Sequence, residues 1–212
     1  EEAAARLARD FPQQNPASLR LTLHAGEDYR HAIEGIRRIH EGMESGLFRA
    51  GDRIGHGVAL ARDAMVGESL VPIEEYLDDL LWEWDRYQNG DLTPELGRSS
   101  RLEKEIQEVS HYLYQKNFAP EILSQARQLR WDKGALSQMG WLLEYAEPSP
   151  SSPEPMQVLK TYLEDPGLRK RGQDPWKTSL DMVNPRFTNQ ARKWLLQELG
   201  RLELTVETNP SS

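Results

Sequence analysis

Two short strings decide the fold: His24-Ala25-Gly26-Glu27 and Arg53-Ile54-Gly55-His56-Gly57. Each closes a strand-like run, Leu19–Leu23 in the first case and Asp52–Ile54 in the second. Between them, from Asp28 to about Leu47, apolar residues recur at helical spacing. The order strand, helix, strand predicts one β-α-β unit with a right-handed crossover. In a (β/α)8 barrel, residues at the carboxyl ends of the strands line the active site.

The first strand alternates strictly between apolar and polar residues. Because strand side chains point to opposite faces in turn, its leucines share one face and its polar residues share the other. In a barrel the leucines would pack beneath the helices, and the polar set would point inward toward the site. The polar set consists of Arg20, Thr22 and His24.

Composition narrows the class of protein. At 212 residues the chain is short for a complete barrel, which typically needs about 250. The formal net charge of −8 argues against a purely electrostatic nucleic-acid binder, and the absence of cysteine suits a cytoplasmic protein. No apolar run is long enough to cross a membrane. The chain starts at Glu1 without an initiating Met, so we expect it to begin inside a longer polypeptide.

The middle of the chain has a different character, and we expect a mostly helical insertion over residues 61–187. Its first helix, opened by Pro72, carries an apolar stripe from Ile73 to Trp84, and further helices follow near residues 102–113, 120–129 and 136–145. The Pro/Ser-rich stretch 147–155 predicts an exposed linker. Residues 188–212 predict a return to the barrel as a helix plus a strand. The acidic side of the first helix is interpreted as a solvated face; it consists of Glu74, Glu75, Asp78, Asp79 and Glu83.

The residue types at the two strand ends suit metal-assisted hydrolysis. A divalent metal lowers the pKa of a water ligand and so generates a nucleophile near neutral pH. Neutral imidazole binds zinc well, and a carboxylic acid can protonate the substrate. His24, Glu27 and His56 supply these groups. The cysteine-based class of zinc nucleobase deaminases is excluded, because the chain contains no cysteine.

The two strings, in this order and one helix apart, resemble the adenosine deaminase family. The resemblance implies that His24 is a Zn²⁺ ligand, that Glu27 protonates the purine ring and that His56 steadies the attacking hydroxide. Gly26 and Gly57 would let the backbone approach the substrate closely. The function implied is hydrolytic deamination of an adenine nucleoside, nucleotide or RNA adenosine to the inosine form.

The resemblance covers residues 15–60 well and residues 190–212 loosely. The family's H-x-H pair on the first strand and its aspartate on the last are missing, so the chain is expected to cover about strands five to seven, with the other metal ligands elsewhere. A large helical insertion on such a barrel resembles, more narrowly, the deaminase subunits of RADAR antiphage-defence systems. That likeness implies antiviral defence, an ATPase partner and a homo-oligomer formed through the insertion, although no motif in the insertion is diagnostic.

Other interpretations remain open. The basic cluster Arg169, Lys170 and Arg171 could contact RNA, although an exposed loop without a ligand is favoured. The chain could serve as an oligomerisation or RNA-binding scaffold derived from a deaminase. It could also be an amidohydrolase with another substrate, because a fold does not fix a substrate. Arg53 is interpreted as a structural ion-pair partner, and His31 and His40 as surface helix residues.

Overall fold

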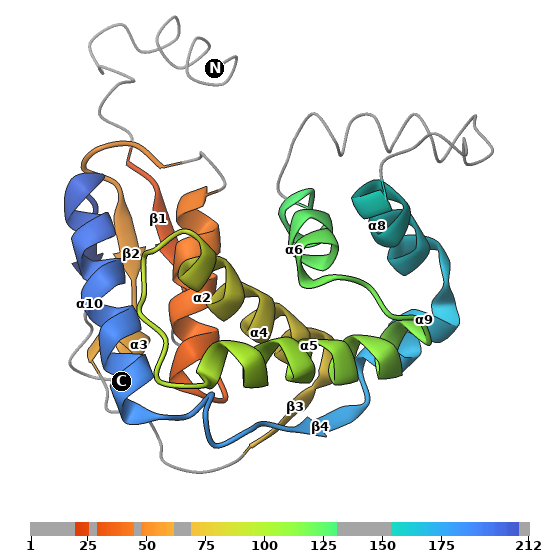
Figure 1. Cartoon of the computed structure of the whole chain (residues 1–212). Coiled ribbons are helices and arrows are strands. Elements are labelled where there is room, and N and C mark those ends of the chain that lie inside the picture. The colour runs from red at the N-terminus through yellow and green to blue at the C-terminus, as the bar shows by residue number, and fades with distance from the viewer. Residues whose placement is uncertain (1–19, 26–28, 45–47, 62–68, 131–153, 208–212) are drawn as a thin grey trace, which may run out of the picture.

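The computed structural model describes residues 20–25, 29–44, 48–61, 69–130 and 154–207 (Figure 1). Three strands form a parallel sheet and two form an antiparallel pair; they are β1 (Thr22–His24), β2 (Arg53–Gly55) and β5 (Thr205–Glu207), and β3 (Leu70–Pro72) and β4 (Pro175–Lys177). The helices are α2 (Ala32–Glu44), α3 (Val58–Ala61), α4 (Ile73–Gln88), α5 (Arg98–Tyr114), α6 (Pro120–Gln128), α8 (Glu154–Glu164), α9 (Pro166–Gly172) and α10 (Pro185–Arg201).

The parallel sheet has the strand order β1-β2-β5, with Leu23, Ile54 and Val206 in register. The predicted β-α-β unit is therefore confirmed as β1-α2-β2. The predicted return strand is also present, since β5 pairs with β2 although the whole insertion separates them in sequence. The α/β class is confirmed. The described residues form an open sheet and not a closed barrel.

Helix α2 lies tightly on the sheet, and its first turn is capped by its own side chains. The backbone N–H of Glu34 donates to Nδ1 of His31 at 3.4 Å, and the N–H of Arg30 donates to the Glu34 carboxylate at 2.8 Å. This reciprocal arrangement acts like a capping box. Further along, a Cβ at Gly42 would lie 2.5 Å from Cδ2 of Leu23, so a larger residue there would force the Leu23 side chain of β1 to move.

A strand near the start of the insertion, β3, pairs with a strand near its end, β4. Strands β3 and β4 are antiparallel, and Leu70 pairs with Lys177. Helix α5 packs along α4, and α6 packs against α8, between these two strands in sequence (Figure 1). Sheet and insertion nevertheless share one apolar core, which includes Ile36 of α2, Tyr76 of α4 and Leu195 of α10.

The apolar stripe of α4 is confirmed, but its acidic side is not the solvated face that the sequence predicts. Asp78, Asp79 and Glu83 are buried, and Glu83 has no exposed surface. Each has an arginine partner from outside α4: Arg130 in the turn after α6, Arg37 of α2 and Arg98 of α5. A buried carboxylate needs such a partner, and α4 is surrounded by helices that supply one.

Three further expectations are wrong. His31 and His40 are buried, with 2% and 6% of their surface exposed. The predicted linker 147–155 ends earlier than expected, because α8 begins at Glu154. The basic cluster 169–171 lies in helix α9, not in a loop. The helix expected near 136–145 and linker residues 147–153 lie outside the described residues. None of the described helices has the length and apolar character needed to cross a membrane.

Candidate active site at the carboxyl ends of the parallel strands

The register of the parallel sheet brings the two sequence strings together. His24 of β1 lies beside Gly55 of β2, which lies beside Glu207 of β5. These residues form a row across the carboxyl ends of the three strands. Two residues earlier along each strand, and so on the same face, Thr22, Arg53 and Thr205 form a second row of exposed residues.

The imidazole rings of His24 and His56 lie 4.9 Å apart, centre to centre, and are tilted by 44°. Gly55 makes room for this pair: a Cβ there would lie 3.3 Å from Cδ2 and Nε2 of His24. That distance is tighter than ordinary van der Waals contact, so a larger residue would push the His24 ring away. The structure thus brings together the two histidines that the sequence assigns to one site.

The backbone at His56 has a left-handed conformation, with φ of 57°. Histidine adopts this conformation more often than most residues, but it still costs about 1–3 kcal/mol. The next residue, Gly57, is held by packing, because a Cβ there would lie 2.6 Å from Cγ1 of Val206. The turn that presents His56 is therefore fixed by β5, and the close approach at Gly57 is to a neighbouring strand.

Arg53 pairs with Glu207 across β2 and β5, at 2.5 Å between Nη1 and Oε1. This confirms Arg53 as an ion-pair partner. Their side chains are 51% and 45% exposed, so the pair contributes at most about 1 kcal/mol to folding. A second carboxylate nearby, Asp52, is buried and accepts the backbone N–H groups of Leu21 and Arg49. These two hydrogen bonds lower the pKa of Asp52 and fix the start of β2 against β1.

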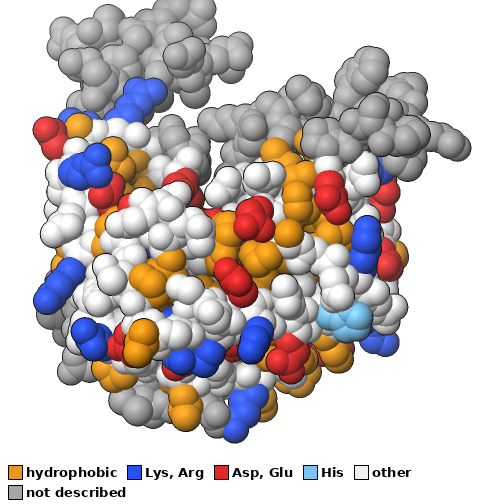
Figure 2. All heavy atoms as spheres, in the orientation of Figure 1, with side chains coloured by type: hydrophobic (Ala, Val, Ile, Leu, Met, Phe, Trp, Pro, Cys, Tyr) orange, Lys and Arg blue, Asp and Glu red, His pale blue; other side chains and the backbone are white. Residues whose placement is uncertain are grey.

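The structure places only some of the other predicted site residues. Gly26 and Glu27 lie outside the described residues, and the basic cluster lies away from this edge. Arg169, Lys170 and Arg171 lie on α9, on the opposite side of the molecule from β1 and β2 in Figure 1. Nε of Arg171 donates to the carbonyl of Leu113, which gives this side chain a structural contact. On the face shown in Figure 2, basic and acidic side chains are interspersed.

The described residues supply donors of the type zinc prefers but not a complete set. A catalytic zinc has three protein ligands and an open position. No group of three or more His, Cys, Asp or Glu side chains able to hold a metal occurs within the described ranges. The imidazole nitrogens of His24 and His56 are of a type that binds zinc, but two residues are fewer than the three ligands that such a site needs.

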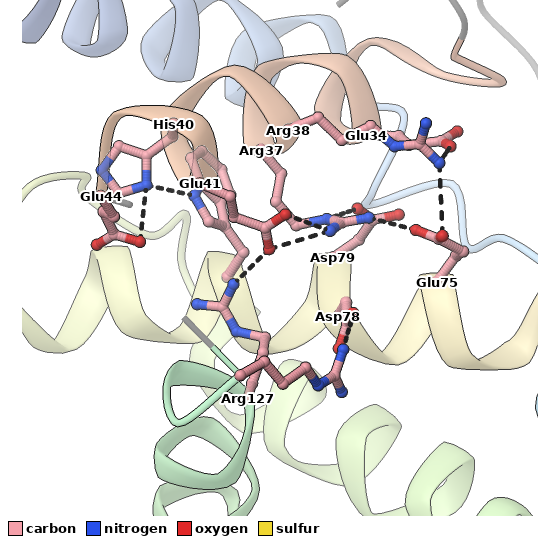
Figure 3. A network of polar contacts seen from close by, with 12 residues as sticks. Glu34, Arg37, Arg38, His40, Glu41, Glu44, Glu75, Asp78, Asp79 and Arg127 are labelled. Carbon is pink, nitrogen blue, oxygen red and sulfur yellow. Dashed lines mark hydrogen bonds and ion pairs between the residues drawn. The ribbon is translucent and has the colours of Figure 1, made fainter. Parts of the chain in front are cut away.

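Sequence reasoning missed a network of buried charges that joins α2 to the insertion (Figure 3). Arg37 of α2 is 3% exposed and contacts Asp79, Glu75 and Glu41 at 2.6, 2.6 and 2.9 Å. Burial alone would lower the pKa of Arg37, but the surrounding carboxylates raise it above its usual value. Arg127 of α6 extends the network by contacting Glu41. The sequence signal that could have indicated this network is the spacing of Arg37 and Glu41, four residues apart on the predicted helix.

No family model matches the chain, and no similar protein is found among curated proteins.

Proposed function

We propose that this chain supplies part of the active site of a metal-dependent adenosine deaminase, with its parallel strands forming about strands five to seven of a (β/α)8 barrel. The observation that carries the proposal is the pairing of His24 and His56, 4.9 Å apart, at the carboxyl ends of adjacent parallel strands. This edge is where parallel α/β folds bind substrates.

The exposure of the parallel sheet supports the barrel. Parallel strands are almost always covered on both faces. Here Ile54 on one face is fully buried, whereas Thr22, Arg53 and Thr205 on the other face are exposed. Both outer strands, β1 and β5, also have one unpaired edge within the described residues. Further strands beside β1 and β5 would cover this polar face and close it around the site.

The proposed chemistry divides among three side chains. A divalent metal, when bound, would supply hydroxide at neutral pH by lowering the pKa of water. His24 would hold that metal through a ring nitrogen, and His56 would orient the attacking oxygen by a hydrogen bond. Glu27 would give its proton to the purine ring nitrogen as hydroxide adds to carbon 6. The bond between carbon 6 and the amino nitrogen would then break as the proton of the added hydroxyl passes to that nitrogen, so that ammonia leaves and the inosine form remains.

We further propose that the protein deaminates its substrate in antiviral defence and is located in the cytoplasm. We also propose that it has an ATPase partner and forms a homo-oligomer through the insertion. Three leucines of the insertion are exposed and would be available to such an interface: Leu70 is 68% exposed, Leu96 fully and Leu180 67%.

The decisive experiment measures ammonia and inosine formation by the intact, zinc-loaded protein with adenosine, ATP and RNA. In the Glu27→Gln variant we expect kcat to fall about a hundredfold or more, because a general acid is lost, while the metal content stays unchanged. Glu121→Gln, an exposed carboxylate on α6, is the matched control and should be fully active. Normal turnover by Glu27→Gln would refute the assigned role. Ammonia release from none of the three substrates would refute the function.

A further inference from the structure

Helix α3 begins two residues after His56 and consists of a single turn, Val58–Ala61. A helix this short leaves its last carbonyl groups without partners inside the helix. A single turn is also not stable by itself in water. The position of α3, and with it the position of the turn that carries His56, is therefore set by contacts with the rest of the molecule.

Two neighbouring helices contact α3 at Ala59, which has no exposed surface. On the side of α2, a Cβ at Gly35 would lie 2.6 Å from Cβ of Ala59, so the two backbones are closely packed. On the side of α10, Nε of Arg192 donates a hydrogen bond to the carbonyl of Ala59 at 2.9 Å. A cationic side chain is favourable at this place, because it satisfies a carbonyl group near the carboxyl end of a helix.

Short backbone hydrogen bonds join α3 to the His56 turn. The N–H of Val58 donates to the carbonyl of His56 at 2.5 Å, and the N–H of Leu60 donates to the carbonyl of Gly57 at 3.0 Å. A residue other than glycine keeps a left-handed backbone, as His56 does, only where its surroundings fix it. A shift of Ala59 would therefore release the backbone of His56, three residues before it.

Arg192 differs from the other buried arginines in its partners. Arg37, Arg98 and Arg127 each form an ion pair with a carboxylate. Arg192 is 7% exposed, its Nη2 has no hydrogen-bond partner, and no carboxylate within the described ranges forms an ion pair with it. Burial of a charge without a carboxylate partner is costly, and such exceptions are expected where a residue serves a functional site.

We propose that Arg192 is a positioning residue, which fixes α3 through the carbonyl of Ala59 and so holds the ring of His56 beside that of His24. The effect on catalysis rests on the proposed function, in which His56 orients the attacking oxygen. The effect on the placement of the His56 ring does not rest on it, because it follows from contacts among described residues alone.

The test compares two substitutions at position 192 in the intact protein. In Arg192→Gln, the amide nitrogen is the same number of bonds from Cα as Nε of arginine, so a donor for Ala59 remains and the charge is lost. In Arg192→Met, a methyl group takes that place and the donor is lost. Val158→Ala is the control for a general loss of stability: Val158 is buried on α8, on the opposite side of the molecule from α3 (Figure 1).

The first measurement is the nuclear Overhauser effect between the ring protons of His24 and His56. The wild-type protein should show this effect, because the ring centres lie 4.9 Å apart. We expect it to be lost in Arg192→Met, since the His56 turn is no longer held, and to be kept in Arg192→Gln and in Val158→Ala. A retained effect in Arg192→Met, or its loss in Val158→Ala, would overturn the inference.

The second measurement is steady-state deamination. In Arg192→Met we expect kcat to fall about tenfold with little change in KM, because a misplaced group lowers the rate of the chemical step. Arg192→Gln should restore most of this loss. The double variant His56→Ala/Arg192→Met should have the kcat of His56→Ala alone, because Arg192 acts through His56. A further fall in the double variant would refute that route.

The two measurements separate failure of this inference from failure of the proposed function. If the wild-type protein deaminates no substrate, the proposed function fails, and the Overhauser effect alone decides whether Arg192 holds the His56 ring. If the wild-type protein is active and Arg192→Met loses the Overhauser effect with an unchanged kcat, Arg192 holds the ring but the catalytic part of the inference is refuted.

Discussion

At the carboxyl ends of the parallel strands, Arg53 and Glu207 form an ion pair with about half of each side chain exposed to solvent. Between α2 and α4, Arg37 is 3% exposed and is surrounded by three carboxylates. The same chemical pair thus occurs in two environments. On the sheet, the charges leave a polar surface open to a ligand or to further strands. Between the helices, they determine which helix lies against which.

The difference indicates which part of the molecule is specified more strictly. A surface ion pair tolerates loss of a partner because water replaces it. A buried pair does not, since the remaining charge has no solvent. The contacts between the insertion and α2 therefore lose much stability when one partner is removed, whereas the ion pair at the edge of the parallel sheet can lose a partner at little cost.

The substitution Arg37→Met tests most directly whether the buried and the exposed ion pairs differ in energy. We expect the free energy of unfolding to fall by about 3–5 kcal/mol, because Asp79 is left buried without its arginine. The matched control is Arg53→Met, which should cost at most about 1 kcal/mol, since that pair is half exposed. Urea denaturation of both variants measures the difference. Equal losses would show that the two environments do not differ in energy.

A second substitution concerns the packing behind His56. Gly57→Ala should lower the free energy of unfolding by about 1–3 kcal/mol, because the new methyl group collides with Val206. In a Val206→Ala background the same change should cost little. Gly200→Ala, where no atom lies within 4 Å of the added Cβ, is the control and should not destabilise. An undiminished cost in the Val206→Ala background would contradict the packing role of Gly57.

The sequence predicted those elements whose pattern is local and long. The apolar stripe of α4 was visible because its residues recur every three or four positions. The burial of its acidic side was not visible in the sequence. Burial of Asp79 depends on Arg37, which is 42 residues away, and burial of Asp78 depends on Arg130, which is 52 residues away. A periodic pattern shows which face is apolar, but it does not show which helices will cover the rest.

Shorter elements escaped prediction for a different reason. Strands β3 and β4 have three residues each, as β1, β2 and β5 do, but neither belongs to a longer alternating run such as the one that ends in β1. The start of α8 was assigned to a linker because of its prolines, yet Pro155 occupies its first turn, where proline is favoured. At the site, the approach of His24 to His56 followed from parallel strand ends. The pairing of Arg53 with Glu207 did not, since it depends on a strand that returns 154 residues later.

The last prediction concerns the pH dependence of stability and His40, which lies in the charged interface without carrying a charge. Burial, with the nearby guanidinium groups of Arg86 and Arg127, lowers the pKa of His40 from 6.5 to about 3. Its Nδ1 accepts a hydrogen bond from Nε1 of Trp82 at 3.3 Å, which requires that nitrogen to be unprotonated. Glu44 lies 3.5 Å away, and burial raises the pKa of this carboxyl group.

Because the folded pKa of His40 lies below the unfolded one, its contribution to stability is complete above pH 6.5 and is lost as the pH falls toward 3. Between about pH 5.5 and 4, where the unfolded histidine is protonated and the folded one is not, the contribution of His40 to stability should fall by about 1.4 kcal/mol per pH unit. His40→Gln keeps an acceptor for Trp82 and should reduce this slope by that amount, as measured by urea denaturation across the range. An identical slope in both proteins would mean that the folded protein admits a charge at this position, and that the interface selects helices by shape and not by charge.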